Sequence, residues 1–276
     1  MYTLTFFFFF FFFFFLVETA QYIRVPYADH NLMPIPKSPD GSWNTSKELD
    51  YLMTADIFAT AWEGVRHSGF QSGDVVVVFG AGPIGQMAAY ISMLRGAARV
   101  YSVDRVEARL KLAESIGAIP INYQKTNAIE ELQAREPNGV DRSFDAVGFE
   151  ARNHDGTKYA SNSVLDAAFE VTRPYGGVGV IGVYYSGEPN PGQPLINVTV
   201  PNQIPINYGS AFMKGLQFGR IGNIDVRYVG KNVLNIIAAG KASPGYVVSS
   251  VIDIHQAPEY YERFSNWEEV KVVIKF

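Results

Sequence analysis

The glycines at positions 80, 82 and 85 have a spacing that suits the binding of a phosphate group by the chain backbone. Residues 80–85 read Gly-Ala-Gly-Pro-Ile-Gly, follow the apolar run 75–79, and open an apolar helical stretch at 82–94. In a GxGxxG motif the first glycine permits a tight turn, the second lets a pyrophosphate approach the backbone, and the third lets strand and helix pack closely. We therefore predict a strand–turn–helix that binds a dinucleotide through Gly80, Gly82, Pro83, Ile84 and Gly85.

Asp104 adds a second feature of such a site. It lies nineteen residues after Gly85, at the end of the next predicted strand. A carboxylate at this point accepts both hydroxyls of a ribose and repels a 2′-phosphate, so it favours NAD over NADP. Arg105 keeps NADP open as the alternative, because a guanidinium either stacks on adenine or pairs with a 2′-phosphate. Glycines that merely form a turn are the weaker interpretation when both features occur together.

Strands and helices alternate from residue 73 onward in the order of a doubly wound parallel sheet. The apolar run 75–79 is typical of a strand that is buried on both faces. We predict strands at 75–79, 99–103, 119–122, 144–147 and 178–183, and helices at 82–94, 106–116, 127–134 and 164–172, the last of them stopped by Pro-Tyr-Gly-Gly at 174–177. The fold class is therefore α/β, with a Rossmann-type sheet.

The segments on either side of this sheet are less regular. Before it we predict a short strand at 20–26, a loop rich in proline at 31–43, and one helix at 45–69. After it we predict an extended loop or lobe at 184–207, helices at 225–239 and 258–265, and strands at 247–254 and 270–276.

Composition excludes several classes of function. The 276 residues contain no cysteine, which removes thiolate nucleophiles, disulfides and every cysteine-containing zinc site. The four histidines are not spaced as HExxH or HxH. A net charge of −4 without a basic block gives no electrostatic footprint for nucleic acid or for an anionic membrane. We expect a cytoplasmic protein whose partners are small molecules or other protein chains.

Residues 6–15 are an uninterrupted run of ten phenylalanines. With the two residues that follow, the apolar segment falls short of the roughly 20 residues that span a bilayer. The lead-in has no Lys or Arg, which a signal peptide would need. Because T-rich DNA encodes phenylalanine, our hypothesis is that residues 1–15 are translated intron, an artefact of the gene model. A genuine hydrophobic anchor is the alternative.

The chain resembles a known family in its order of elements, in Val-Val-Val-Phe-Gly-Ala-Gly-Pro-Ile-Gly ending at Gly85, and in Lys-Val-Val-Ile-Lys at 271–275. These features are similar to the zinc-dependent alcohol dehydrogenase branch of the medium-chain dehydrogenases. Within it, residues 25–32 and above all Asp-Ala-Val-Gly-Phe-Glu-Ala-Arg at 145–152, followed by His154, resemble the glutathione-independent formaldehyde dehydrogenases and their aldehyde-dismutating relatives. The resemblance runs from about residue 20 to the C-terminus.

The resemblance implies NAD-linked oxidation of a short aldehyde or alcohol, with zinc in the full-length parent, and a homo-oligomer when the chain is complete. It implies that Asp56 is a ligand of the catalytic zinc and that Thr60 contacts the nicotinamide. Residues that it places against the dinucleotide are Ile84, Gly85, Asp104, Arg109, Val147, Arg152 and His154, with Gly182 and Gly219 as further candidates. Arg220 stands where a glutamine is expected. Without the resemblance, Asp56 is an acidic residue on a solvated face or a cap, and Arg152 and His154 are surface groups of a polar loop.

The chain also departs from the family. The Cys and His ligands of the catalytic zinc and the four Cys of a structural zinc are absent, and one carboxylate cannot hold a catalytic zinc. We therefore expect a Phe tract at 1–15, a remnant of a GroES-like β catalytic domain at 16–55, a Rossmann domain at 56–242, and a return to the catalytic domain at 243–276.

With this arrangement we expect a fragment of a dehydrogenase that lacks most of its zinc site and is inactive as given. Two alternatives stay open. One is a zinc-free reductase of the quinone or enoyl type from the same superfamily, and the other is an NAD(P)-binding pseudoenzyme that senses the cofactor without turnover.

Overall fold

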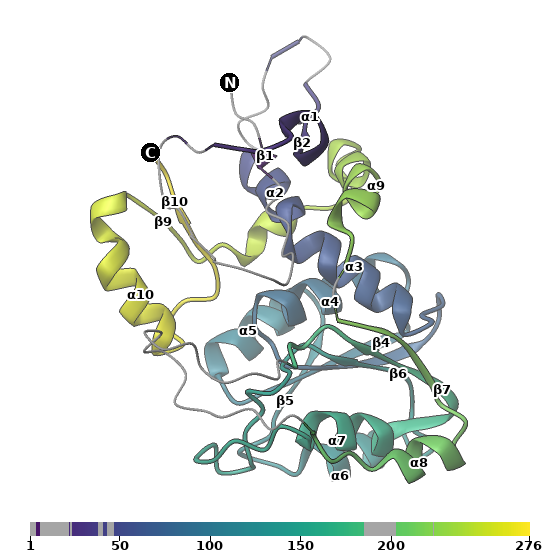
Figure 1. Cartoon of the computed structure of the whole chain (residues 1–276). Helices are drawn as coiled ribbons and strands as arrows, with labels where there is room; N and C mark the ends of the chain where they lie inside the picture. Colours follow the sequence, from purple (N-terminus) through teal and green to yellow (C-terminus); the bar gives the residue numbers. More distant parts are fainter. Residues whose placement is uncertain are drawn as a thin grey trace. The chain divides into compact units, whose positions relative to one another are not determined.

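A six-stranded parallel sheet forms the centre of Gly64–Gly222, one of two units into which the chain divides. Its strands lie in the order β5-β4-β3-β6-β7-β8. Figure 1 labels β4, β5, β6 and β7 of this sheet. Their bounds are β3 Val75–Phe79, β4 Arg99–Asp104, β5 Ile119–Asn122, β6 Val140–Asp145, β7 Thr172–Val180 and β8 Gln217–Ile221. Counted along the chain this is the order 3-2-1-4-5-6 of a doubly wound Rossmann sheet, whose strand order reverses between β3 and β6. The predicted fold class is confirmed.

The computed structural model describes residues 4–5, 22, 24–37, 41–42, 47–184, 203–222 and 224–276, without the side chains of residues 4, 5, 220, 221 and 227. The Phe tract at 6–15 and most of the predicted loop at 184–207 lie outside these residues. Within them, no helix has the length and apolar character needed to cross a membrane.

Helices cover both faces of the sheet. Their bounds are α4 Pro83–Leu94, α5 Glu107–Ser115, α6 Ala128–Arg135, α7 Ser163–Val171 and α8 Tyr208–Met213. Figure 1 shows α4 and α5 on one face, with α6, α7 and α8 on the other. Strand residues such as Val77 and Val178 are fully buried, together with Phe169 of α7. Burial of these side chains fixes the sheet, and with it the loops at its carboxyl edge.

The prediction for β6 started four residues late because charged residues interrupt its apolar pattern. Asp141 accepts from the Val75 backbone N–H at 2.7 Å and from Arg173 Nε at 2.6 Å. Arg142 Nε lies 2.7 Å from an Asp74 carboxylate oxygen, with both side chains largely buried. These partners let a charged pair enter a central strand, which residue pattern alone does not reveal.

The helix predicted at 164–172 is confirmed to within one residue at each end as α7, whereas residues 174–177, predicted only as the stop that follows it, belong to β7. Pairing with β6 jumps from Thr172 to Gly177, so residues 173–176 form an irregularity within the strand. Strand β8 and helix α8 were not predicted at all. Gly219 and Arg220 break the apolar pattern of β8, yet the glycine is required there: an added Cβ would overlap the carbonyl oxygen of His67.

The second unit consists of Met1–Glu63 and Asn223–Phe276. Its elements are β1 Leu4–Thr5, α1 Ala28–Asn31, β2 Leu32–Met33, α2 Glu48–Leu52, η2 Met53–Ala55, the first part of α3 Ile57–His67, α9 Val226–Ala238, η3 Pro244–Val247, β9 Ser250–Ile252, η4 Ile254–Gln256, α10 Ala257–Ser265 and β10 Val272–Ile274. β1 pairs with β2 in antiparallel fashion, and β9 pairs with β10 in parallel. Lys47 Nζ donates to the Ile237 carbonyl at 2.9 Å, which ties α2 to α9.

Two predictions in this unit are wrong. The helix predicted at 45–69 is broken, because Asp56 takes a non-helical backbone conformation (φ −152°, ψ −76°) between η2 and α3. The strand predicted at 20–26 is absent from the residues of that segment that the structure describes, 22 and 24–26. Helix α9 and helix α10 are confirmed to within one residue at each end.

Candidate functional site

The glycine loop lies between β3 and α4 at the carboxyl edge of the sheet. Gly80 has φ +92°, and a Cβ there would lie 2.7 Å from a methyl group of Val147. A Cβ on Gly85 would overlap the carbonyl oxygen of Gly80. Among the described residues, a Cβ on Gly82 would, in contrast, meet only an Arg109 guanidinium nitrogen, at 3.8 Å. The first and third glycines are therefore enclosed by protein, while the second is open toward the described part of the chain, which leaves room there for a ligand phosphate.

The N-terminus of α4 is built to receive an anion. Gly82 is its N-cap residue, Pro83 follows at the first helical position, and no side chain caps the helix. The backbone N–H groups of the first turn and the positive end of the helix dipole both favour a negative group at this point. The twelve-residue helix thus presents its N-terminus beside the open space in front of Gly82.

Asp104 closes the other side of the loop as the last residue of β4. One carboxylate oxygen accepts from the Ala81 backbone N–H at 2.7 Å. The other accepts from the backbone N–H groups of Arg105 at 2.7 Å and Val106 at 2.9 Å. The side chain is 8% exposed. Three backbone donors therefore hold the carboxylate in place, and its remaining lone pairs are the ones left for ribose hydroxyls.

Arg109 supplies a positive charge next to this edge. Its Nε is buried and makes no hydrogen bond within the described part of the chain. Burial lowers the pKa of Arg109, the charge of Arg105 lowers it further, and the charge of Asp104 opposes both. Nη1 of the same guanidinium lies 3.8 Å from the position of a Cβ on Gly82. A guanidinium at this point, with a buried Nε that has no acceptor among the described residues, is an arrangement that an anionic ligand would complete.

Val147 and Gly182 lie in the turns that follow β6 and β7. Val147 borders Gly80, and Gly182 packs against Gly148 so closely that neither has room for a Cβ. Asp145 lies between these turns, fully buried, and sequence reasoning assigned it no role. Asp145 is the last residue of β6, but the strand predicted at 144–147 placed it inside the strand, so its position at the carboxyl end was not recognised.

Arg152 and His154 lie in a loop beyond β6. The Arg152 guanidinium carbon is 4.6 Å from the centre of the Tyr159 ring, and one of its nitrogens donates to the Gly156 carbonyl at 3.2 Å. Burial raises the pKa of Tyr123, and the charges of Arg105, Asp104 and Arg152 all act on that pKa as well. Arg152 is therefore within electrostatic range of the Asp104 edge, whereas the His154 side chain is exposed.

The remaining predicted residues lie elsewhere. Gly219 is inside β8, where it lets the strand approach the His67 backbone. The Arg220 side chain lies outside the described residues. Asp56 and Thr60 belong to the other unit, where the Thr60 hydroxyl donates to the Asp56 carboxylate at 2.7 Å. All of these assignments, including those at the glycine loop, stay predictions about ligand contact.

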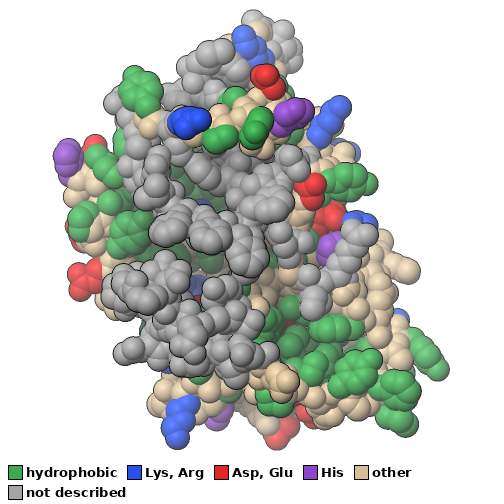
Figure 2. All heavy atoms as spheres, viewed as in Figure 1, with side chains coloured by type: hydrophobic (Ala, Val, Ile, Leu, Met, Phe, Trp, Pro, Cys, Tyr) green, Lys and Arg blue, Asp and Glu red, His purple; other side chains and the backbone are tan. Residues whose placement is uncertain are grey.

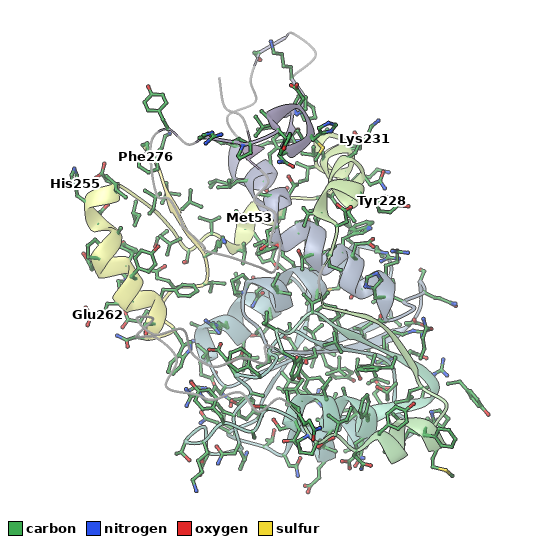
Figure 3. All side chains as sticks on the ribbon, in the orientation of Figure 1. Met53, Tyr228, Lys231, His255, Glu262 and Phe276 are labelled. Carbon is green, nitrogen blue, oxygen red and sulfur yellow. The ribbon has the colours of Figure 1, made fainter. Side chains whose placement is uncertain are left out.

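A zinc site does not fit the residues that the structure describes. Among them, no group of three His, Cys, Asp or Glu side chains is arranged to hold a metal ion. Asp56 is exposed and shares its carboxylate with Thr60. His255, labelled in Figure 3, has an exposed ring whose nearest carboxylate, from Asp253, is 3.9 Å away. We therefore assign no zinc chemistry to these side chains.

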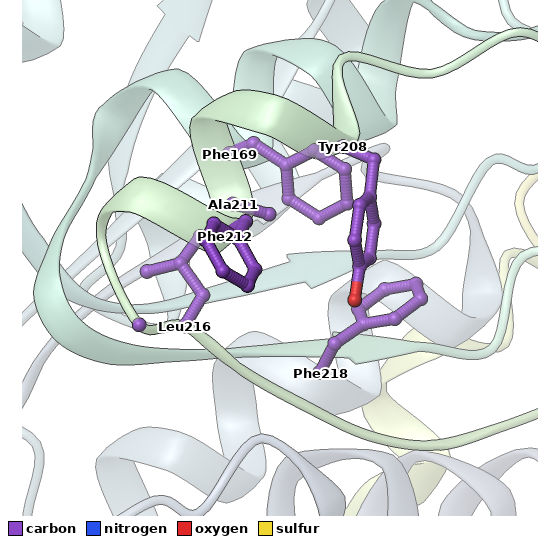
Figure 4. A pocket seen from close by; sticks show the side chains of 7 residues that line it. Phe169, Tyr208, Ala211, Phe212, Leu216 and Phe218 are labelled. Carbon is purple, nitrogen blue, oxygen red and sulfur yellow. The ribbon is translucent and has the colours of Figure 1, made fainter.

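An apolar pocket lies on a different part of the sheet unit. It is lined by Phe169, Tyr208, Ala211, Phe212, Gly215, Leu216 and Phe218 (Figure 4). The rings of Phe169 and Phe218 meet edge to face with centres 5.5 Å apart. Exposed hydrophobic side chains gather over α8 nearby (Figure 2). Its lining contains no charged group, so this pocket does not suit a dinucleotide.

Comparisons with known proteins agree with the fold. Residues 83–218 match the family described as zinc-binding dehydrogenase. The chain is 32% identical over 259 residues to the glutathione-independent formaldehyde dehydrogenase of Bacillus subtilis (strain 168), covering 92% of this chain and 62% of that protein. The solved structure of alcohol dehydrogenase TADH from Thermus sp. ATN1 superposes with a TM-score of 0.72 at 30% identity, covering 91% of this chain and 63% of that one.

A short chain alcohol dehydrogenase from E. coli CFT073, solved as a complex with NADH, shares the fold at 19% identity with a TM-score of 0.68, and the match covers 89% of this chain and 63% of that one.

A doubly wound sheet with a glycine loop at its switch point defines the class of Rossmann-type α/β proteins. Within that class, residues 83–218 match the zinc-binding dehydrogenase family, and the proteins to which the chain is similar include formaldehyde dehydrogenases. The chain spans a little over three fifths of the length of these relatives.

Proposed function

We propose that this protein is an NAD-dependent oxidoreductase that acts on a short aldehyde or alcohol of the formaldehyde type. The observation that carries the proposal is the glycine loop, with its enclosed first and third glycines and its open second glycine beside the N-terminus of α4. The relatives, which are formaldehyde and alcohol dehydrogenases, support the substrate class.

The described residues supply the parts that a dinucleotide needs. The open backbone at Gly82 and the first turn of α4 receive the two phosphates. Arg109 adds a charge-assisted donor, because its buried Nε has no acceptor in the described part of the chain. Asp104, already held by three backbone N–H groups, accepts the hydroxyls of the adenosine ribose. When bound, NAD supplies the ring that accepts or returns a hydride.

Electrostatics favours NAD over NADP. The Asp104 carboxylate is fixed at the ribose position and would meet a 2′-phosphate with a like charge. Arg105 and Arg109 reduce this repulsion without removing it, since the Asp104 carboxylate does not swing away from its three donors. Family members combine NAD with zinc, but the residues described here do not provide a zinc site, so no step of the reaction is assigned to that metal.

Binding of NADH to the purified full chain tests the proposal. Fluorescence titration should give saturable NADH binding. Asp104→Ala should raise the NADH dissociation constant and reduce the ratio by which the protein prefers NADH to NADPH. Glu114→Gln, which removes a negative charge from an exposed position on α5, the helix that follows Asp104 in the chain, is the matched control and should leave both affinities unchanged.

Turnover is measured in parallel with formaldehyde and with short alcohols as substrates. Reduction of NAD with these substrates would support the oxidoreductase assignment. Saturable NADH binding with no turnover on any of them, at every metal supplied, would instead favour a pseudoenzyme. An NADH titration without saturation would overturn the proposal altogether.

A further inference from the structure

Asp145 is a fully buried carboxylate at the carboxyl end of β6. One of its oxygens accepts from the backbone N–H groups of Val147 at 2.8 Å and Gly148 at 3.0 Å. The other accepts from the Tyr184 hydroxyl at 2.7 Å. Burial raises the pKa of Asp145, and these three donors oppose that rise. A polar group placed so deeply without such partners would destabilise the fold.

The backbone around Asp145 joins two turns that are distant in sequence. Its carbonyl oxygen accepts from the backbone N–H groups of Ile181 at 3.0 Å and Gly182 at 2.9 Å. The Phe149 N–H donates to the Val183 carbonyl at 2.9 Å. We call residues 146–149 and 181–184 the paired turns. Asp145 forms hydrogen bonds with both turns. One carboxylate oxygen binds residues 146–149, and the other carboxylate oxygen and the backbone carbonyl bind residues 181–184.

The paired turns are packed so closely that two of their glycines have no room for a side chain. A Cβ on Gly182 would lie 2.7 Å from the Asp145 carboxylate, and a Cβ on Gly148 would overlap the Val183 backbone. The two turns therefore move together, and their common position depends on the side chain that both of them bind.

The paired turns border the glycine loop. Val147 lies against Gly80, and the Ala146 N–H donates to the Phe79 carbonyl at 2.9 Å at the end of β3. They thus form the β6–β7 side of the switch point, while Asp104 lies on the β4 side. In a sheet of this order a dinucleotide spans the crevice with one mononucleotide on each side. With the adenosine ribose at Asp104, the nicotinamide half belongs over the paired turns.

We propose that Asp145 and Tyr184 are positioning residues that fix the paired turns for the nicotinamide half of the cofactor. The inference rests on the proposed function and deepens it. Neither side chain needs to touch the ligand, since Asp145 has no exposed surface. Their effect reaches the ligand through the backbone of the paired turns.

The test compares three ligands on four proteins. The ligands are NADH, AMP and nicotinamide mononucleotide, and the proteins are the wild type, Asp145→Asn, Tyr184→Phe and Ser143→Ala. Ser143 is the matched control because its buried hydroxyl also joins β6 to β7, through Thr172 at 2.6 Å, but lies within the strands and away from their carboxyl ends. Calorimetry gives the dissociation constants, and thermal unfolding reports the fold.

Tyr184→Phe removes one donor to a buried carboxylate, and we expect the dissociation constants for NADH and nicotinamide mononucleotide to rise about tenfold. Asp145→Asn keeps the shape but replaces an acceptor by an amide donor, so a loss of similar size is expected. AMP should bind all four proteins with the same affinity, because its site lies on the β4 side. Ser143→Ala should change none of the affinities.

Equal weakening of AMP and NADH in the two variants would show a merely structural role and overturn the inference. Unchanged NADH binding in Tyr184→Phe would overturn it as well, and this variant decides the matter if Asp145→Asn does not fold. Both results leave the proposed function intact, since the wild type still binds NADH. A wild type that binds neither AMP nor NADH would overturn the proposed function itself.

Discussion

Replacing Gly82 by alanine should weaken NADH binding while leaving the fold intact. Gly82 has φ −67° and ψ −174°, a backbone conformation that alanine adopts freely, and among the described residues its added Cβ would meet only Arg109, at 3.8 Å. Alanine restricts the conformations of the unfolded chain more than glycine does, which stabilises the folded protein by about 0.4–1 kcal/mol. Loss of a favourable N-cap glycine destabilises by a similar amount, on the order of 0.5–1 kcal/mol. The two effects nearly cancel, so Tm should change by less than about 4 °C.

The same methyl group would occupy the space that a pyrophosphate must enter. An overlap of this kind costs about 1–3 kcal/mol, which corresponds to a rise of about 5- to 150-fold in the NADH dissociation constant. Fluorescence titration and thermal unfolding by circular dichroism measure the two quantities on the same sample. A Gly82→Ala protein with wild-type NADH affinity would refute the assignment of this loop as the phosphate site.

Gly85→Ala is the matched contrast. Its Cβ would overlap the Gly80 carbonyl oxygen, so the start of α4 must move away from the loop. We expect destabilisation of about 3 kcal/mol and a fall in Tm of about 6–12 °C, in addition to lost binding. A stable Gly85→Ala protein would contradict the close packing of helix against loop.

Three further predictions concern charged groups. Arg109→Met should raise the NADH dissociation constant about tenfold at low salt and by a smaller factor near 0.5 M salt, and it should leave Tm unchanged. An equal rise in the dissociation constant at both salt concentrations would argue against a charge contact. Arg142→Ala leaves Asp74 buried without its partner, so urea unfolding should show a loss of about 3–5 kcal/mol, and a loss below 1 kcal/mol would mean that the pair is solvated. Burial raises the pKa of Asp145 above its ordinary value of 3.8, so the contribution of Asp145 to stability is complete below pH 3.8 and is lost as pH rises through the folded-state pKa. The free energy of unfolding of the wild type, relative to that of Asp145→Asn, should therefore fall with rising pH. A difference that grows with rising pH would contradict this prediction.

The sequence predicts the first half of the sheet almost to the residue, and the reason is physical. Strand β3 is a run of four valines and a phenylalanine that is buried on both faces, so its apolar pattern is unbroken. Strand β8, Gln217–Ile221, contains a glycine and an arginine and went unpredicted. Its glycine is explained by the approach of the His67 backbone, a contact between segments about 150 residues apart that no local pattern reports.

The candidate site likewise has one part that local sequence spacing predicts and one part that depends on contacts between distant segments. The glycine loop and Asp104 follow from local spacing, because the turn, the helix and the next strand are consecutive in the chain. The pairing of Asp145 with Tyr184 joins residues 39 positions apart, and it depends on how β7 is laid beside β6. Residue types alone gave no sign of it.

Asp104 and Asp145 show why geometry, and not residue type, decides the two roles. Each aspartate is the last residue of a strand that neighbours β3. In each, one carboxylate oxygen accepts from two backbone N–H groups of the turn that follows, and the other carboxylate oxygen accepts from a third donor. For Asp104 that third donor is the Ala81 N–H of the glycine loop, and the residue keeps 8% of its surface exposed. For Asp145 it is the Tyr184 hydroxyl, and no surface remains. One carboxylate is thus available to a ribose, while the other acts only on the backbone around it. Exposure of Asp145 alone should not give it the role of Asp104. Tyr184→Ala, which opens the Tyr184 side to water, should weaken nicotinamide mononucleotide binding without creating a second ribose site for AMP. A second AMP equivalent in calorimetry would contradict this division of roles.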